Sequence, residues 1–412
     1  MMEKGSILFR KPLAVDEAIA LVEEMSGRAK TETVPLYRAH GRILAMDLVA
    51  THDVPAFDKS PYDGFAVQSA DLLTASRDEP VTLPVQYVQG AGHVGEPLCA
   101  GQAIRIMTGA KIPDGADAIV MLELVQADER VVTFKRPARD ANISYRGEDM
   151  AMGTNIVDRG TRINPGVIAL LATFGYEQVD VYVKPHITVF ATGDELVEPG
   201  CKKGDGQIYN SNAYMILAQI EELGGTATYG GILPDTFTST KRAVEEALQS
   251  SDAIVTTGGV SVGDFDYLPD VYDALGATVL FNKVGMRPGS VTTVAHLEGR
   301  LLFGLSGNPS ACFVGTELFV GTYMKTLFGQ AERPVVEATL GADFPKANPF
   351  DRFVRGHITI DAVGQAVVHP SGKDKSGIVS SLATCNALIH LPGGTRGFQK
   401  GDTVRCRIID QL

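Results

Sequence analysis

Apolar and polar positions follow three different patterns along this chain of 412 residues. Residues 13–25 carry apolar positions at helical spacing with acids early in the segment, which predicts an amphipathic helix. From about Val54 to Phe134, short segments rich in Val, Ile and Leu alternate with Gly, Pro and Asp turns, which predicts a small β module. A second helix is expected over 165–174, because Asn164 is a good cap and Pro165 suits the first helical position.

From His186 the pattern becomes strand–helix–strand, with helices expected at about 212–223, 237–249, 267–275 and 310–328. Strands that alternate with helices form a mostly parallel sheet covered on both faces. After Arg333 only short strands remain, which predicts a compact all-β domain. The fold class expected is therefore α/β multidomain, with a central three-layer α/β/α sheet. Its domains are an N-terminal helical/β region at 1–182, with the β module at about 54–140 inserted, a central domain at 183–330 and a β domain at 331–412.

Composition narrows the class of protein. Apolar residues make up 44% and charged residues 21% of the chain, as in ordinary soluble proteins. No apolar run approaches the roughly 20 residues that span a bilayer, and the N-terminus lacks the pattern of a secretory signal, so we expect no membrane association. Five scattered cysteines without a Cys-x-x-Cys pair favour the cytoplasm. The net charge of −12 argues against nucleic-acid binding, although a small anionic substrate remains compatible with it.

The most informative segment is a glycine-rich turn after the apolar strand that begins at Ala253. Gly258, Gly259 and Gly263 bend the backbone, with Ser261 between them and two acids, Asp264 and Asp266, just beyond. Such turns let main-chain N–H groups converge on an anionic oxygen, at the edge where an open α/β sheet usually holds its ligand. By itself the segment would be interpreted as a plain tight turn.

A second strand-to-helix turn follows the apolar strand LLF and contains Gly307, Asn308 and Pro309. Its exposed N–H groups are expected on the same side as those of the first turn. A capped connection without any ligand is the alternative for this turn alone. Two such turns at the carboxyl ends of strands in one sheet favour a nucleotide or phosphate site. A third segment, Ser60 to Ala66, places Asp63 in what is either an ordinary β-turn or a rigidly held carboxylate.

Seven motifs together resemble the MoeA family of molybdopterin molybdenumtransferases, which includes the gephyrin E-domain. They occur in the family's order and cover nearly the whole chain: SPYDGFA (60–66), IMTGAKIPDGADAIVMLE (106–123), RGED (146–149), FATGDEL (190–196), TTGGVSVGDFDY (256–267), MRPG (286–289) and GLSGNP (304–309). The resemblance implies the molybdenum-cofactor-biosynthesis fold for the central domain. It also implies a reaction in which molybdate and adenylyl-molybdopterin give molybdenum cofactor, with release of AMP assisted by Mg²⁺ or a similar divalent cation.

The resemblance also implies the roles of particular residues. Catalytic positions are matched by Asp63, Thr108, Glu195, Asp235 and Asp266, and Glu195 and Asp266 are the acids expected to hold the metal. Carboxylates suit a hard cation that keeps some of its water. For each acid the alternative is a solvated loop carboxylate, and Asp194 and Asp264 are left open. The family is dimeric and shares its sites between subunits, so Asp63 and Thr108 are expected to act on the partner's site.

Molybdate is a dianion and requires cations or dense N–H donors. The candidates are Lys283, Arg287, Arg352, Arg355, Lys373 and Lys375, together with Ser371 and Ser376. The chain departs from the family here, because Ser290-Val291 stands where Lys-Pro is usual and Ser306 where proline is usual. One hypothesis is that Lys373 or Lys375 supplies the missing charge. Two exposed loop lysines without a role are an equally good interpretation.

Two alternatives to a molybdenumtransferase stay open from the sequence. The central module also resembles molybdopterin adenylyltransferases, which makes that activity the first rival, although the flanking modules and SPYDGFA count against it. A non-catalytic scaffold of the same fold is the second rival, and Ser290 and Ser306 favour it to some degree. The sequence does not separate molybdate from tungstate or identify the physiological cation. Nor does it identify the partner that delivers substrate, for which an adenylyltransferase is a candidate.

Overall fold

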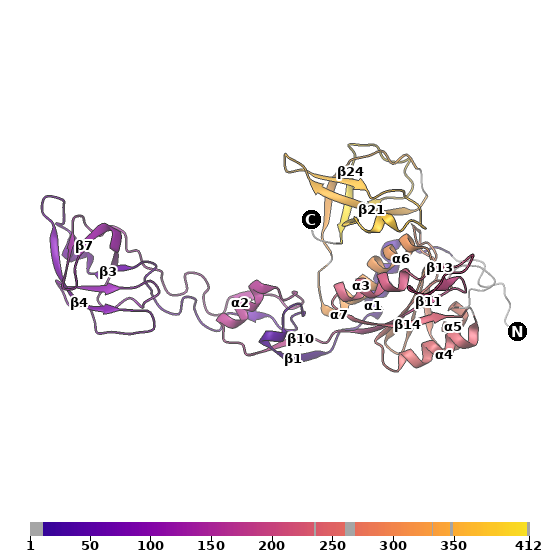
Figure 1. Cartoon of the computed structure of the whole chain (residues 1–412), viewed down its shortest axis with the longest axis horizontal. Helices are drawn as coiled ribbons and strands as arrows, with labels where there is room; N and C mark the ends of the chain where they lie inside the picture. Colours follow the sequence, from indigo (N-terminus) through magenta and orange to yellow (C-terminus); the bar gives the residue numbers. More distant parts are fainter. Residues whose placement is uncertain (1–10, 235, 260–267, 332, 347–348, 410–412) are drawn as a thin grey trace. The chain divides into compact units, whose positions relative to one another are not determined.

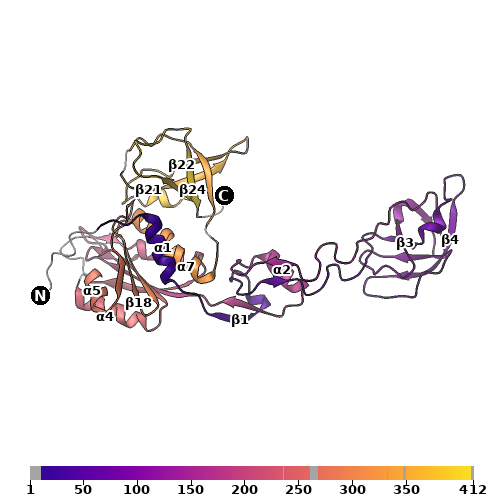
Figure 2. The same ribbon diagram turned by 180° about the vertical axis from the view of Figure 1, so that it is seen from behind.

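The computed structural model describes residues 11–234, 236–259, 268–331, 333–346 and 349–409 (Figures 1 and 2). The chain divides into two compact units. The first comprises Met1–Met46, Arg159–Asn164 and Gln178–Leu412, and the second comprises Asp47–Asp158 and Pro165–Glu177. The first unit therefore holds both the α/β sheet and the terminal β domain.

A six-stranded sheet forms the centre of the first unit, in the order β14-β11-β15-β19-β18-β16. The strands are β11 (His186–Thr192), β14 (Thr226–Leu233), β15 (Ala253–Thr257), β16 (Thr278–Phe281), β18 (Thr293–Leu297) and β19 (Arg300–Leu305). The first four in this order pair in parallel, whereas β18 pairs antiparallel with both of its neighbours, β19 and β16. This arrangement confirms the mostly parallel sheet expected from the alternation of strands and helices.

Helices cover both faces of this sheet, as Figures 1 and 2 show. They are α1 (Val15–Met25), α3 (Asn212–Glu222), α4 (Phe237–Leu248), α5 (Leu268–Ala274), α6 (Pro309–Gly315) and α7 (Gly321–Phe328). Successive strand residues point to opposite faces, so Val189 and Ala191 pack in the core under α3 and α6 while Phe190 packs in the core with α4 and α5. The apolar runs of β11, β15 and β19 are thus explained by burial on two sides.

One expected helix is interrupted. The segment predicted as a single helix over 310–328 consists of α6, a π-helical turn η4 (Thr316–Val320) and α7. Glu317 in this turn is 3% exposed and accepts a hydrogen bond of 2.8 Å from Gln219. Burial raises the pKa of its carboxyl group, whereas Arg333 opposes that rise. The other helices of the central domain lie within two residues of the expected ranges.

The terminal β domain is a closed barrel in the first unit. Its strands are β20 (Val335–Leu340), β21 (Asp351–Ile360), β22 (Ala366–Pro370), β23 (Ala387–Leu391) and β24 (Thr403–Ile408). The barrel closes because β21 pairs with β22 on one side and with β23 on the other. A short strand from the central domain, β17 (Met286–Arg287), adds to β21 in parallel and places Arg287 opposite Arg352. The MRPG motif therefore joins the two domains.

The second unit contains the small β module predicted from the sequence. Its sheet has the order β6-β3-β5-β4-β8-β7, built from β3 (Gly64–Val67), β4 (Val81–Gln89), β5 (Ala103–Ile106), β6 (Ala118–Met121), β7 (Val125–Ala127) and β8 (Val131–Phe134). The unit also holds β2 (Leu48–Val49), β9 (Asn155–Val157) and α2 (Pro165–Thr173).

Short elements complete the fold. In the first unit, β1 (Thr31–Pro35) pairs with β10 (Gln178–Tyr182), and β12 (Leu196–Val197) pairs with β13 (Ile208–Tyr209). The remaining 3-10 turns are η1 (Leu36–Arg38), η2 (Ser69–Leu72), η3 (Leu122–Leu124) and η5 (Ser380–Leu382). Among the helices of the described segments, none has both the length and the apolarity that crossing a bilayer requires.

Substitution of Phe303 in β19 tests how much the central core contributes to stability. Its side chain is fully buried, and its ring lies 5.8 Å from that of Tyr323, centroid to centroid. We expect Phe303→Ala to lower the free energy of unfolding by about 3–5 kcal/mol, because it removes buried apolar area and leaves a cavity. Denaturant unfolding measures this loss. Val279→Ala is the control, since Val279 is 36% exposed and should cost less than about 1 kcal/mol. Equal losses in the two variants would contradict this account of the core.

Candidate active site

A cavity of the first unit lies at the carboxyl ends of β11, β15 and β19 and has a volume of about 1210 Å³. Open α/β sheets usually hold their ligands at this edge. Its lining comes from both the central domain and the terminal barrel: Thr192, Gly193, Glu195, Ile208, Tyr209, Ser211, Gly258, Gly259, Arg287–Val291, Ser306–Pro309, Ala311, Lys346, Arg352, Asp374, Ser376, Gly377 and Val379.

The first glycine turn enters this cavity directly after β15. Gly258 and Gly259 have φ values of +98° and +65°, in the left-handed region that favours glycine. A Cβ at Gly258 would lie 2.5 Å from the backbone oxygen of Thr192, so no larger residue fits without displacing β11. The turn is therefore close-packed main chain at the end of the sheet.

The second turn lies beside the first. Gly258 donates a backbone hydrogen bond of 2.9 Å to the carbonyl of Leu305, and a Cβ at Gly307 would lie 3.5 Å from the Cα atom of Gly258. The buried amide of Asn212 in α3 then connects both strands. It donates to the Gly307 carbonyl at 2.8 Å and to the Thr257 hydroxyl at 3.1 Å. The structure thus brings the two turns to one side of the sheet.

Glu195 is the acid that lines the cavity from the central domain. It follows β11 and is exposed, which leaves its carboxylate accessible to a cation. Close to it, the buried Thr192 hydroxyl has no hydrogen-bond partner among the described residues. The neighbouring Asp194 is exposed and is not part of the lining. No cluster of three potential metal ligands occurs in the described part of the chain.

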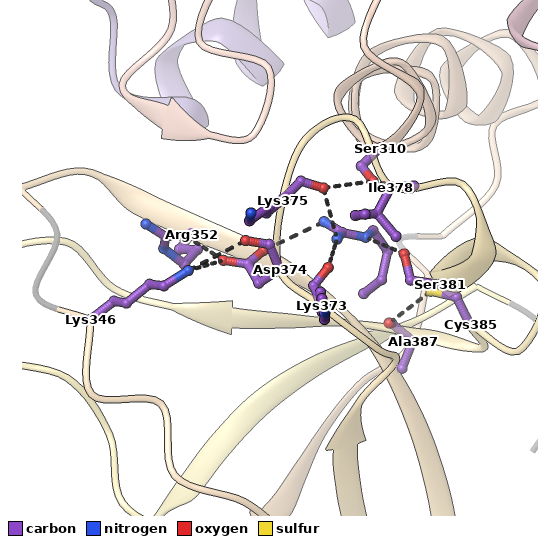
Figure 3. A network of polar contacts seen from close by, with 11 residues as sticks. Ser310, Lys346, Arg352, Lys373, Asp374, Lys375, Ile378, Ser381, Cys385 and Ala387 are labelled. Atoms are coloured by element: carbon purple, nitrogen blue, oxygen red, sulfur yellow. Dashed lines mark hydrogen bonds and ion pairs between the residues drawn. The ribbon is translucent and has the colours of Figure 1, made fainter.

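The barrel supplies a cationic wall (Figure 3). Arg352 and Lys346 line the cavity, and both pair with the carboxylate of Asp374, which is 9% exposed. The Lys346 Nζ atom lies 3.9 Å from Asp374 Oδ2. Arg287 extends this wall, because it stands opposite Arg352 in the β17–β21 pairing. Ser376 lines the same side.

The loop that carries Asp374 is fixed by hydrogen bonds to its main chain. Arg355, which is 1% exposed, donates to the carbonyls of Lys373 and Lys375 at 3.3 and 3.5 Å. Burial lowers the pKa of Arg355, and Asp374 opposes that effect. From the central domain, the backbone N–H of Ser310 donates to the Ser376 carbonyl at 2.9 Å and its hydroxyl to the Ile378 carbonyl at 2.7 Å. Figure 3 shows Ser310, Lys375 and Ile378 in this network.

Several candidate cations lie away from the cavity. Lys283, Arg355, Lys373 and Lys375 are not among its lining residues, although Asp374, Ser376 and Gly377 of the loop at 373–378 are. Lys373 and Lys375 are exposed, and their carbonyls, rather than their ammonium groups, take part in the network. Ser371 is buried outside the lining.

Sequence reasoning missed Lys346 and Asp374. The available signal was the Lys-Asp-Lys order at 373–375. An acid between two exposed lysines, in a loop expected to face an anion, suggests a carboxylate that pairs with basic side chains from other parts of the chain.

Asp63 and Thr108 come together in the second unit. Both the backbone N–H and the hydroxyl of Thr108 donate to Asp63 Oδ1 at 2.7 Å. These two hydrogen bonds lower the pKa of the Asp63 carboxyl group, with a smaller contribution from Arg105. The turn at Ser60–Ala66 thus holds a carboxylate in one orientation. The remaining candidates, Asp235, Ser261, Gly263, Asp264 and Asp266, lie outside the described residues.

Comparison with family models accounts for most of the chain. Residues 13–175 match the MoeA N-terminal region (domain I and II), residues 188–326 a probable molybdopterin binding domain, and residues 337–407 the MoeA C-terminal region (domain IV). The three matches follow one another in the order that the sequence motifs indicated.

Relatives and solved structures agree with these matches. The chain is 51% identical to a molybdopterin molybdenumtransferase of Bacillus subtilis (strain 168), over 99% of this chain and 96% of that protein. It is 48% identical to one of Staphylococcus aureus (strain MSSA476), over 96% and 95%. A crystal structure of a molybdopterin biosynthesis moeA protein from Pyrococcus horikoshii OT3 is 30% identical and has a TM-score of 0.82, covering 97% of this chain and 100% of that one. The chain therefore belongs to the MoeA family of molybdopterin molybdenumtransferases.

Proposed function

We propose that this protein is an enzyme that transfers molybdenum from molybdate to molybdopterin, using adenylyl-molybdopterin and releasing AMP. The observation that carries the proposal is the meeting of two main-chain turns, the Glu195 carboxylate and a cationic wall at one cavity. Main-chain N–H groups suit the phosphates of the adenylate, and cations suit the incoming oxyanion. The family relationship supports the same reaction.

The two turns have a binding role in this proposal. Gly258, Gly259 and Gly307 allow the chain to approach the diphosphate closely, and Asn212 keeps both turns at a fixed separation. Preorganised donors stabilise charge that develops on a leaving phosphate. Gly263 and Ser261 belong to the same proposed set by their place in the motif.

Glu195 fits the binding of a divalent cation, since its exposed carboxylate lines the cavity. We assign it this role together with Asp266, and Asp235 a supporting one. A bound Mg²⁺ would neutralise charge on the diphosphate during cleavage. The Thr192 hydroxyl, which is unsatisfied among the described residues, adds a polar group on that side.

The protein is proposed to work as a homodimer in which Asp63 and Thr108 complete the partner's site. The Thr108 hydrogen bonds that fix Asp63 favour a role beyond that of a solvated turn residue. The lowered pKa keeps the Asp63 carboxylate ionised to more acidic pH than an ordinary aspartate.

The first test separates Glu195 from its neighbour. We expect Glu195→Gln to slow AMP release from adenylyl-molybdopterin about a hundredfold and to raise the Mg²⁺ concentration needed for half activity, because one anionic ligand is lost. Asp194→Asn is the matched control, since Asp194 is exposed and outside the lining. Equal effects of the two substitutions, measured by chromatographic detection of AMP, would refute the assignment.

The second test concerns the first turn. Gly258→Ala should weaken AMP binding by about tenfold or more, because its Cβ would lie 2.5 Å from the Thr192 oxygen and force the turn to move. Gly276→Ala provides the control, since Gly276 has a similar φ of +78° but nothing within 4 Å of an added Cβ. Isothermal titration measures the affinities. A Gly258→Ala protein with native AMP affinity would show that the turn does not contact the nucleotide.

The third test addresses the shared site. Asp63→Ala and Asp266→Ala chains, each inactive alone, are coexpressed with different tags and purified as mixed dimers. Each mixed dimer contains one site in which both Asp63 and Asp266 are intact, so we expect it to recover about half of the wild-type activity. Mixed dimers that remain inactive would place both residues in the same chain's site.

The two rival functions predict different results in binding and product assays. An adenylyltransferase would form adenylyl-molybdopterin from molybdopterin and ATP without molybdate, and a scaffold would bind neither AMP nor Mg²⁺. The proposed enzyme binds AMP with Mg²⁺ and forms no adenylylated product from ATP.

A further inference from the structure

Two very short strands carry part of the cavity lining. β12 begins directly after Glu195, and both residues of β13, Ile208 and Tyr209, line the cavity. The two strands pair over two residues each, and the Ile208 N–H donates to the Glu195 carbonyl at 2.9 Å. A parallel ladder this short is too weak to fix the position of either strand by itself. Other contacts must therefore hold Glu195 and Tyr209 in place.

The loop that connects these strands adds little rigidity of its own. It runs from residue 198 to residue 207, most of its residues are exposed, and it contains Gly200, Gly204 and Gly206. Exposed, glycine-rich chain has many accessible conformations. The Tyr209 hydroxyl donates to the Cys201 carbonyl at 3.1 Å, which closes the loop on itself. The ends of the loop still have to be held by neighbouring elements.

One phenol of the central sheet connects the ends of both strands. The Tyr229 hydroxyl, on β14, donates to the Oε1 atom of Glu198, the residue directly after β12. The same hydroxyl accepts a hydrogen bond of 2.8 Å from the Nδ2 atom of Asn210, the residue directly after β13. Because Tyr229 stands opposite Val189 in the β11–β14 pairing, the position of this hydroxyl is set by the central sheet (Figure 1).

Helix α3 completes these contacts. Tyr214 in this helix donates to Glu198 Oε2 at 2.9 Å, and its ring lies 5.4 Å from that of Tyr229, centroid to centroid. Asn210 is 2% exposed, and its Oδ1 atom accepts a hydrogen bond of 3.3 Å from the backbone N–H of Ala213. Glu198, Asn210, Tyr214 and Tyr229 are called the Tyr229 network below.

The chemistry of this network favours firm placement over simple packing. Glu198 is half-buried, and its carboxylate accepts from two neutral phenols. Partial desolvation of a carboxylate costs free energy that an apolar side chain would avoid. An anionic acceptor, however, forms stronger hydrogen bonds than a neutral one. Burial and the hydrogen bond to Glu198 raise the pKa of Tyr229, so this phenol keeps its proton and remains a donor at neutral pH.

We infer that Tyr229 is a positioning residue of this enzyme, whose hydroxyl fixes Glu195 and Tyr209 within the cavity through Glu198 and Asn210. The inference rests on the proposed function, in which Glu195 binds the divalent cation. Tyr229 and Glu198 are not among the lining residues of the cavity. The Tyr229 hydroxyl therefore acts on a ligand through the two short strands.

This role has a definite consequence for cation binding. A carboxylate that is already held in place binds a cation without a further loss of conformational freedom. If the network is broken, Glu195 must be ordered when the cation binds, so a higher cation concentration is needed. The cleavage step itself, once the cation is bound, should proceed at nearly the same rate.

Amide hydrogen exchange of the ligand-free protein tests the structural step. Tyr229→Phe removes the hydroxyl and keeps the ring. We expect exchange at Ile208 and Asn210, whose N–H groups bond across the β12–β13 pair, to become about five- to tenfold faster, because the ends of both strands lose their anchor. Mass spectrometry of peptides that cover 205–212 measures this change.

Tyr323→Phe is the matched control in the same domain. Tyr323 is 3% exposed, and its hydroxyl donates to the Asp252 carbonyl at 3.3 Å, so this substitution also removes a single phenolic hydroxyl from the interior. We expect both variants to lower the melting temperature by similar amounts. Exchange at Ile208 and Asn210 should stay native in Tyr323→Phe, which separates positioning from a general loss of stability.

Mg²⁺ titration of AMP release tests the functional step. We expect Tyr229→Phe to raise the Mg²⁺ concentration for half activity about three- to tenfold and to change the rate at saturating Mg²⁺ by less than about twofold. Tyr323→Phe should have the native Mg²⁺ requirement. Glu198→Ala should resemble Tyr229→Phe, whereas Glu198→Gln should restore much of the native behaviour, because its amide oxygen still accepts a hydrogen bond from a phenol.

Three results would overturn the inference. The first is native exchange at Ile208 and Asn210 in Tyr229→Phe, and the second is a native Mg²⁺ requirement in that variant. The third is a Glu198→Gln protein as defective as Glu198→Ala, since Glu198 would then act through its charge. Failure of the proposed function would appear separately, as wild-type protein that releases no AMP at any Mg²⁺ concentration although exchange in Tyr229→Phe is faster.

Discussion

The parallel pairing of β15 with β19 is the constraint on which the site depends. Thr257 stands opposite Leu305 in this pairing, so both strands end at the same level and their turns emerge together. The Gly258–Leu305 and Asn212–Gly307 hydrogen bonds extend the pairing into the turns. A shift in register would separate the two turns and their main-chain donors, because each turn begins where its strand ends.

The opposite wall depends on a different set of contacts. β17 leaves the central domain to pair with β21, and Ser310 at the start of α6 donates to the loop of the barrel. These contacts attach the barrel to the central domain beside the cavity. Charged side chains from the barrel can act on a ligand held by the central sheet because these attachments bring them to the same lining.

Much of this architecture could be predicted from the sequence. The doubly buried strands were recognisable as apolar runs between helices, and the glycines at 258 and 259 marked a turn with positive φ values where a side chain is strained. Local pattern does not record which side chains of a loop point inward, however. The sequence pattern favoured Lys373 and Lys375 because of their charge. The residues that line the cavity instead include Asp374 and Lys346, which is far from this loop in the sequence. The π-helical turn at Thr316–Val320 was also missed, since its apolar sequence differs little from that of a regular helix.

Ser310 holds the barrel loop through carbonyl oxygens of residues 376 and 378, and Arg355 through those of residues 373 and 375. Every amino acid has a carbonyl oxygen, so the attachment of this loop does not depend on the identity of most of its side chains. Mutation can thus change the charge and size of the exposed side chains at 373, 375 and 376 while the backbone stays in its place. Substitution at these exposed positions therefore carries little penalty for the attachment of the barrel loop to the central domain.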